Sequence, residues 1–66
     1  MADRRHQPAW LTDIELAERF RVSRITIWRW SAAGRLPKPI RLTPGTTRWA
    51  LEEIEDLEAR LKAQHR

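Results

Sequence analysis

Apolar residues recur at helical spacing immediately after Thr12. Thr12 and Glu15 match a capping box, in which the side chain of each residue accepts a hydrogen bond from the backbone N–H of the other. Leu11 and Leu16 stand at the two positions of a hydrophobic staple, which fixes how the chain enters a helix. The pattern predicts a helix over residues 13–20, with an apolar face made of Leu16, Ala17 and Phe20.

The same signals recur eleven residues later. Ser23 is the expected N-cap of a second helix over residues 24–33, with Val22 and Ile27 in the staple positions. Gly34 follows directly, where a helix end favours a left-handed residue. Because only three residues separate the two helices, they predict a helix-turn-helix.

A short hairpin is expected after the second helix. Residues 40–42 and 46–49 are β-prone and flank Pro44 and Gly45. Proline followed by glycine predicts a type II turn, in which Gly45 supplies a positive φ. Beside a helix-turn-helix, such a hairpin would be a wing.

Residues 51–63 predict a third helix with one apolar stripe, which is expected to dock on the first two helices. The stripe consists of Leu51, Ile54, Leu57 and Leu61. Three bulky aromatic residues are assigned to the core: Trp10, Trp30 and Trp49. Residues 1–9 show no periodicity and are interpreted as a disordered arm. Residues 10–64 are therefore expected to form one domain, mostly α with a small β-hairpin: three helices plus a two-stranded wing.

Charge is unevenly distributed along the 66 residues, although the net charge is only +4. Eight basic residues and no acid lie between Arg19 and Arg48, whereas residues 49–58 contain five acids and no base. Clustered guanidinium groups on a folded segment are typical of a surface that meets phosphate. The alternative interpretation is a solvated basic face.

Other function classes have little support in the sequence. Cysteine is absent and the two histidines stand near opposite ends, so no metal or cofactor is expected. No phosphate-binding loop or nucleophile with a base is present, which argues against an enzyme. No apolar run approaches the about 20 residues of a membrane span, and no signal-peptide pattern is present, so we expect a cytoplasmic protein.

Helical periodicity separates the second helix into two faces. Ile27 and Trp30 point toward the core, while Arg24, Trp28 and Arg29 lie on the outward face. Each arginine is suited either to a guanine edge or to a phosphate. Trp28 is expected either to contact DNA or to fold back onto the wing. The candidate DNA-binding residues are Ser23, Arg24, Ile25, Thr26, Trp28, Arg29, Arg35, Lys38, Arg41, Thr46, Thr47 and Arg48.

Two segments, residues 22–30 and residues 34–42, together with Arg48-Trp49 and the closing acidic helix, resemble the AlpA-like family. This family of small winged-helix proteins is related to the MerR DNA-binding domain and includes excisionases, or recombination directionality factors. The similarity extends over about residues 11–61. Two positions depart from the family pattern: Arg21 stands where glycine is common, and Trp28 replaces a tyrosine.

The resemblance implies a winged helix-turn-helix that binds specific double-stranded DNA. An excisionase binds and bends attachment-site DNA and helps a tyrosine or serine integrase to excise a mobile element. The resemblance thus implies an integrase partner and a nucleoid-associated bacterial or phage-type protein. Cooperative head-to-tail self-association on DNA is a further expectation, because one small domain reads few base pairs.

Two alternatives remain at this point. One is a small transcriptional regulator with the same fold, distinguished only by its target site. The other is a protein-interaction module that uses the helix at 51–63 and the exposed Ile25 and Trp28.

Overall fold

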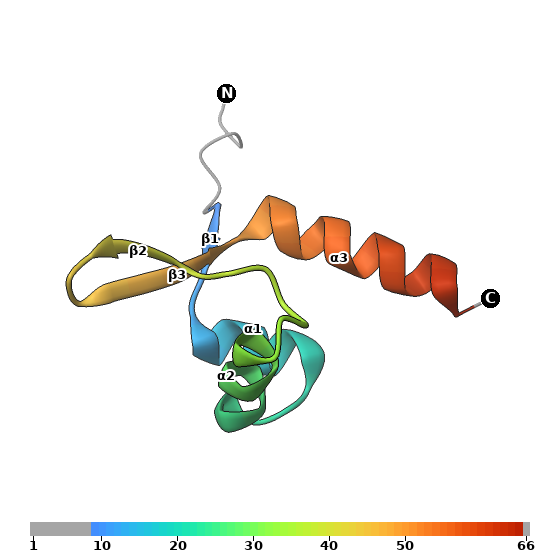
Figure 1. Ribbon diagram of the computed structural model, residues 1–66, viewed down its shortest axis with the longest axis horizontal. Coiled ribbons are helices and arrows are strands. Elements are labelled where there is room, and N and C mark those ends of the chain that lie inside the picture. Colours follow the sequence, from blue (N-terminus) through green and yellow to red (C-terminus); the bar gives the residue numbers. More distant parts are fainter. Residues whose placement is uncertain (1–8, 66) are drawn as a thin grey trace.

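Three helices and a three-stranded antiparallel sheet are formed by residues 9–65, the part of the chain that the computed structural model describes (Figure 1). In chain order the elements are β1 (Trp10–Leu11), α1 (Asp13–Phe20), α2 (Arg24–Ala32), β2 (Ile40–Thr43), β3 (Thr46–Ala50) and α3 (Leu51–Gln64). The bounds of α1 are those predicted, and α2 and α3 each differ by one residue at the C-terminal end. The predicted arm lies outside the described residues except for Ala9.

Side-chain caps begin both short helices, as predicted. Glu15 donates its backbone N–H to Thr12 Oγ1 at 3.0 Å, and Thr12 donates its own to Glu15 Oε1 at 2.8 Å, which confirms the capping box. Ser23 Oγ accepts the backbone N–H of Thr26 at 3.1 Å, which confirms the second cap. The starting points of α1 and α2 are therefore set locally.

A left-handed residue ends each short helix. Gly34 has a φ of 79°, as predicted, and Arg35 donates its N–H to the Trp30 carbonyl at 2.9 Å. After α1 the same position is taken by Arg21, with φ 59° and ψ 48°. The left-handed position is thus taken at Arg21 by a residue with a Cβ, for which this conformation is strained.

The strand β1 is an addition to the predicted two-stranded hairpin. The strand order is β1-β3-β2, so β3 lies in the centre of the sheet. Trp10 pairs with Ala50, and Leu11 pairs with Trp49. Two residues are too few to show an alternating pattern in the sequence, which is why this strand was missed. The pairing joins the start of α1 to β3.

The hairpin forms where expected, but its turn is not type II. Of the two glycines, only Gly34 has a positive φ, so the prediction for Gly45 was wrong. The ring of Pro44 fixes its φ at about −65°. The primed turns that normally close two-residue hairpins need a positive φ at this position and are therefore excluded. The register instead shifts between Arg41 and Thr43, and this irregularity adjusts the strands to the turn.

The hydrophobic core is small and contains seven buried residues contributed by all three helices, β3 and the link after α2. They are Leu16, Ala17, Ile27, Leu36, Trp49, Ile54 and Leu57. Leu11, Phe20, Val22 and Trp30 pack against them as partly buried residues. Trp49 is fully buried and Trp30 partly so, which agrees with their core assignment.

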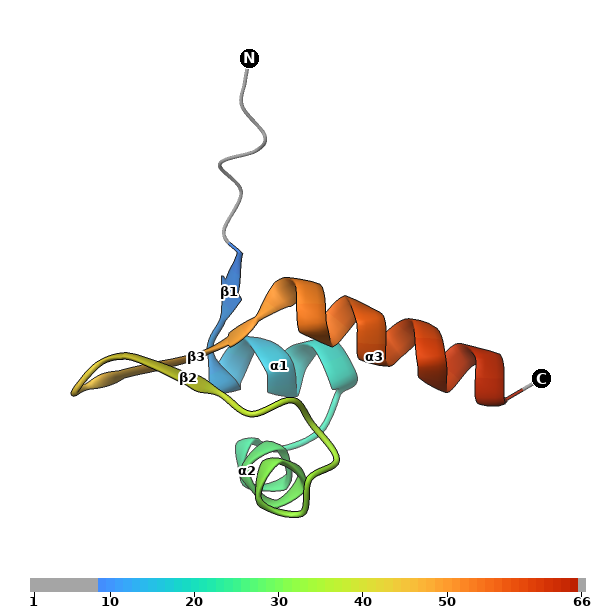
Figure 2. The same ribbon diagram turned by 45° about the horizontal axis from the view of Figure 1, so that its top comes forward.

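Two predicted core contributions are wrong. Trp10 is 38% exposed, because neighbouring residues of a strand point to opposite faces and Leu11 takes the inward one. Leu61 is 41% exposed, because α3 runs outward beyond the body of the domain (Figure 2). The apolar stripe of α3 is therefore only partly covered.

We expect Arg21→Gly to stabilise the domain by about 0.5–1 kcal/mol, because glycine adopts the left-handed conformation without a Cβ clash. For a chain of this size the melting temperature should rise by about 2–8 °C. Thermal unfolding followed by circular dichroism measures it. Ala33→Gly is the matched control: Ala33 has a φ of −84°, so glycine there should be neutral or destabilising. An unchanged or lower melting temperature for Arg21→Gly would show that the turn is not strained.

Candidate nucleic-acid interface

The outward face of α2 is basic and exposed. Ile27 is buried, whereas Arg24 and Arg29 are exposed and Ile25 is 68% exposed. This agrees with the two faces predicted for the helix. Ser23 and Thr26 are held by the N-cap, and their hydroxyl oxygens lie 3.0 Å apart.

The two hairpin arginines lie on opposite faces of the sheet. Arg41 pairs with Thr47, whereas Arg48 pairs with Ile40, and adjacent cross-strand pairs alternate between faces. Thr47 shares the face of Trp49, the side chain that meets α2. Arg41 and Thr47 are therefore on the side of α2, while Arg48 and Thr46 are on the other. Arg48 also donates from Nη1 to the Thr47 carbonyl at 2.9 Å.

Arg35 and Lys38 lie in the link between α2 and β2, beside α3. Both are exposed, and they line a depression of about 490 Å³ whose other wall includes Glu53, Asp56 and Arg60. The structure therefore places these two predicted contacts next to the acidic helix and apart from the outward face of α2.

One member of the basic stretch is neutralised by α3. Arg19 donates from Nε to Glu58 Oε2 at 2.7 Å and from Nη2 to Glu58 Oε1 at 2.9 Å. The hydrogen bond from Arg19 and its charge lower the pKa of Glu58 below its ordinary value. Such a bidentate pair fixes α1 to α3 and leaves Arg19 little capacity for phosphate.

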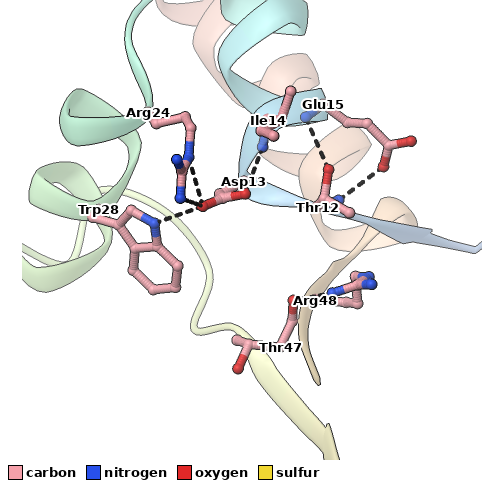
Figure 3. Close-up of polar contacts among 8 residues, drawn as sticks. All are labelled: Thr12, Asp13, Ile14, Glu15, Arg24, Trp28, Thr47 and Arg48. Carbon is pink, nitrogen blue, oxygen red and sulfur yellow. Dashed lines mark hydrogen bonds and ion pairs between the residues drawn. The ribbon is translucent and has the colours of Figure 1, made fainter. Parts of the chain in front are cut away.

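A second carboxylate, Asp13, joins α1 to α2 (Figure 3). Its Oδ2 accepts hydrogen bonds from Arg24 Nε at 3.0 Å, Arg24 Nη2 at 2.9 Å and Trp28 Nε1 at 2.9 Å. Its Oδ1 accepts the backbone N–H of Ile14 at 2.7 Å. Partial burial acts to raise the pKa of Asp13, but the hydrogen bonds from Trp28 and Arg24 outweigh it and lower the pKa.

Trp28 packs against the sheet, which is one of the two expectations for this residue. Its ring centroid lies 5.0 Å from that of Trp49, with an interplanar angle of 58°. This ring contact attaches the middle of α2 to β3, and the bond to Asp13 attaches it to α1. Trp28 nevertheless stays 41% exposed.

Sequence reasoning missed Asp13, which it treated only as the first residue of a helix. Thr12 and Ser23 are equivalent caps eleven residues apart, so Asp13 and Arg24 are the first residues of their helices. Opposite charges at these two equivalent positions were the available signal.

The chain matches no protein-family model, and neither the curated proteins nor the solved structures gave a significant match. Within residues 9–65, no three His, Asp or Glu side chains come together as a metal site. No helix in this range has the length and apolar character needed to cross a membrane.

We expect acid to weaken the domain through Asp13 and Glu58. Both carboxyl groups have lowered pKa values, so they bind fewer protons in the folded chain than in the unfolded one. The stability that they contribute is present at neutral pH and is lost as the pH falls below about 4. Urea unfolding across this pH range, followed by tryptophan fluorescence, measures the loss.

The double variant Asp13→Asn/Glu58→Gln should lose less stability over that range than the wild-type chain. Glu18→Gln is the matched control, since the exposed Glu18 side chain makes no ion pair with residues 9–65. A double variant that is as sensitive to acid as the wild-type chain would contradict the assignment.

Proposed function

We propose that this protein binds double-stranded DNA as a winged helix-turn-helix, with α2 as the recognition helix and the β2–β3 hairpin as the wing. The observation that carries the proposal is the exposed face of α2, which presents the guanidinium groups of Arg24 and Arg29. The major groove of B-DNA, about 12 Å wide, admits a helix presented in this way. Two capped helices joined by a short turn are the framework that presents it.

The arrangement of charge supports the proposal. In Figure 2, α2 lies at the bottom of the domain, and α3 begins above α1 and runs to the right. The first turn of α3, which carries Glu52 and Glu53, therefore begins on the side of α1 opposite to α2. Arg41 and Thr47 of the hairpin extend the α2 side of the molecule and suit contacts with the phosphate backbone.

The more specific role that we propose is that of an excisionase, which binds and bends attachment-site DNA for an integrase. Its support is the resemblance of residues 22–30 and 34–42 to the AlpA-like family. A transcriptional regulator of the same fold is the alternative, and the two roles can coexist in one protein. On this proposal the protein works in the cytoplasm at the nucleoid, with head-to-tail copies on adjacent sites.

An interaction module that uses α3 together with Ile25 and Trp28 is less well supported. Trp28 packs against Trp49 and bonds to Asp13, so part of the proposed apolar pair is used within the domain. Of the pair, only Ile25 is more than half exposed, at 68%. A single exposed side chain is ordinary for a protein surface.

Duplex binding is expected to depend strongly on salt, because phosphate contacts release counterions. Fluorescence anisotropy of the full chain with a labelled duplex, titrated at several salt concentrations, tests the proposal. Sites obtained by selection from a random duplex pool should bind about 10³-fold or more tightly than random duplex. Equal affinity for selected and random DNA would contradict sequence-specific binding. The absence of binding at low salt would contradict the proposed function.

Arg29→Ala should weaken duplex binding by about 1–3 kcal/mol. If Arg29 reads a base, discrimination at one base pair is lost. If it contacts phosphate, affinity falls for all sequences and the slope of log K against log salt becomes shallower by about one. Arg60→Ala, which removes an exposed arginine of α3, is the matched control and should change neither quantity. Equal losses for both variants would show a diffuse charge effect and no interface on α2.

A further inference from the structure

Asp13 determines which edge of the Arg24 guanidinium faces outward. A guanidinium presents two edges with paired N–H donors: a side edge of Nε and Nη2, and an end edge of Nη1 and Nη2. Asp13 Oδ2 accepts from both donors of the side edge, at 3.0 Å and 2.9 Å. Nη1 and the second hydrogen of Nη2, which form the end edge, make no hydrogen bond with residues 9–65, and the Arg24 side chain is 61% exposed.

The carboxylate that holds Arg24 is itself fixed from both helices. Trp28 of α2 donates to the same Oδ2, and the backbone of Ile14 in α1 donates to Oδ1. Trp28 in turn packs against the fully buried Trp49. Figure 3 shows Arg24, Asp13 and Trp28 converging at the start of the two helices. The direction of the free end edge is therefore set by the core and not by a mobile side chain.

Charge separates two possible roles for this arginine. The Arg24–Asp13 pair has no net charge, so it gains little from the field of the phosphates, and its carboxylate is repelled by them. The O6 and N7 acceptors of guanine are uncharged and require a planar donor pair at a fixed angle. Because the Arg24 end edge is fixed and Asp13 balances the charge of the guanidinium, the edge is suited to the acceptors of guanine and not to a phosphate.

We propose that Arg24 reads a guanine in the major groove through Nη1 and Nη2, and that Asp13 is the positioning residue that gives Arg24 this role. The inference rests on the proposed function of duplex binding and adds the base that one residue recognises. Arg29, on the same helix, makes no ion pair with residues 9–65 and has no such support. The two arginines on this face therefore differ, because a carboxylate fixes the guanidinium of Arg24 and none among the described residues fixes that of Arg29.

The test begins with the duplex site that the wild-type chain selects from a random pool. Base preference is then measured at each position for the wild type, Arg24→Ala and Asp13→Asn, by competition with single-base variants of the site. Arg24→Ala should lose the preference for guanine at one position. Asp13→Asn should weaken the same preference by about tenfold, because the arginine stays but its edge is free to turn.

A modified base tests the contact directly. Replacing the chosen guanine with 7-deazaguanine removes the N7 acceptor and should weaken wild-type binding by about tenfold. The same replacement should leave the affinity of Arg24→Ala unchanged. Glu58→Gln is the matched control: it breaks the ion pair with Arg19, remote from α2, and should preserve the preference at every position.

Three results would overturn the inference. A uniform loss of affinity in Arg24→Ala, with a shallower salt slope, would assign Arg24 to phosphate. An unchanged preference in Asp13→Asn would make Asp13 merely structural. A selected site whose guanines all tolerate 7-deazaguanine would remove the contact. Failure of the wild-type chain to bind any duplex is a different outcome, since it removes the proposed function itself.

Folding of each variant is checked by circular dichroism. If Asp13→Asn is unfolded, Trp28→Phe replaces it: phenylalanine keeps an aromatic ring beside Trp49 but removes the donor that helps to hold Asp13. A smaller loss of the same guanine preference, at the same position, is expected. An unaltered preference in Trp28→Phe would then count against a positioning role for Asp13.

Discussion

The burial of Trp49 is the interaction on which the rest of this small domain depends. Its strand, β3, pairs with β1 on one side and β2 on the other and continues directly into α3. Its indole is the largest fully buried side chain and receives Trp28 from α2. Trp49 Nε1 has no hydrogen-bond partner among the described residues, a cost of about 1–3 kcal/mol. The packing of one large ring therefore outweighs an unsatisfied donor in a chain with few other core residues.

Charges far apart in the sequence meet once the chain is folded. The stretch from Arg19 to Arg48 contains no acid, yet Glu58 binds Arg19 and Asp13 binds Arg24 from outside it. Arg35 and Lys38 also come to lie beside the acids of α3. The basic surface is consequently smaller than the sequence indicates, and it is concentrated on the outward side of α2 and on one face of the hairpin. Such concentration matters more for recognition than the net charge does.

Local signals explain which parts of the fold could be predicted. Caps at Thr12 and Ser23 and the glycine after α2 each act within a few residues, so the helix starts and the turn positions follow from the sequence. The strand β1 and the exposure of Trp10 depend on pairing with residues far along the chain, which no local pattern reveals. The type of the hairpin turn was predicted wrongly for another reason. Proline at its first position has a fixed φ, and the strands accommodate the turn through an irregularity in their register.

In the candidate site, too, the sequence predicts which residues share a face but not which contacts they make. Periodicity correctly placed Arg24 and Arg29 on one face of a helix, where they look equivalent. They differ because α1 contributes a carboxylate to one of them, and that carboxylate is in turn held by a tryptophan stacked on the core. An arginine with balanced charge and a fixed edge is suited to neutral acceptors in a defined geometry, whereas a free one is suited to phosphate at many geometries. The number of basic residues in a sequence indicates a surface that can meet nucleic acid. What each basic side chain recognises is indicated only by its contacts in the folded protein.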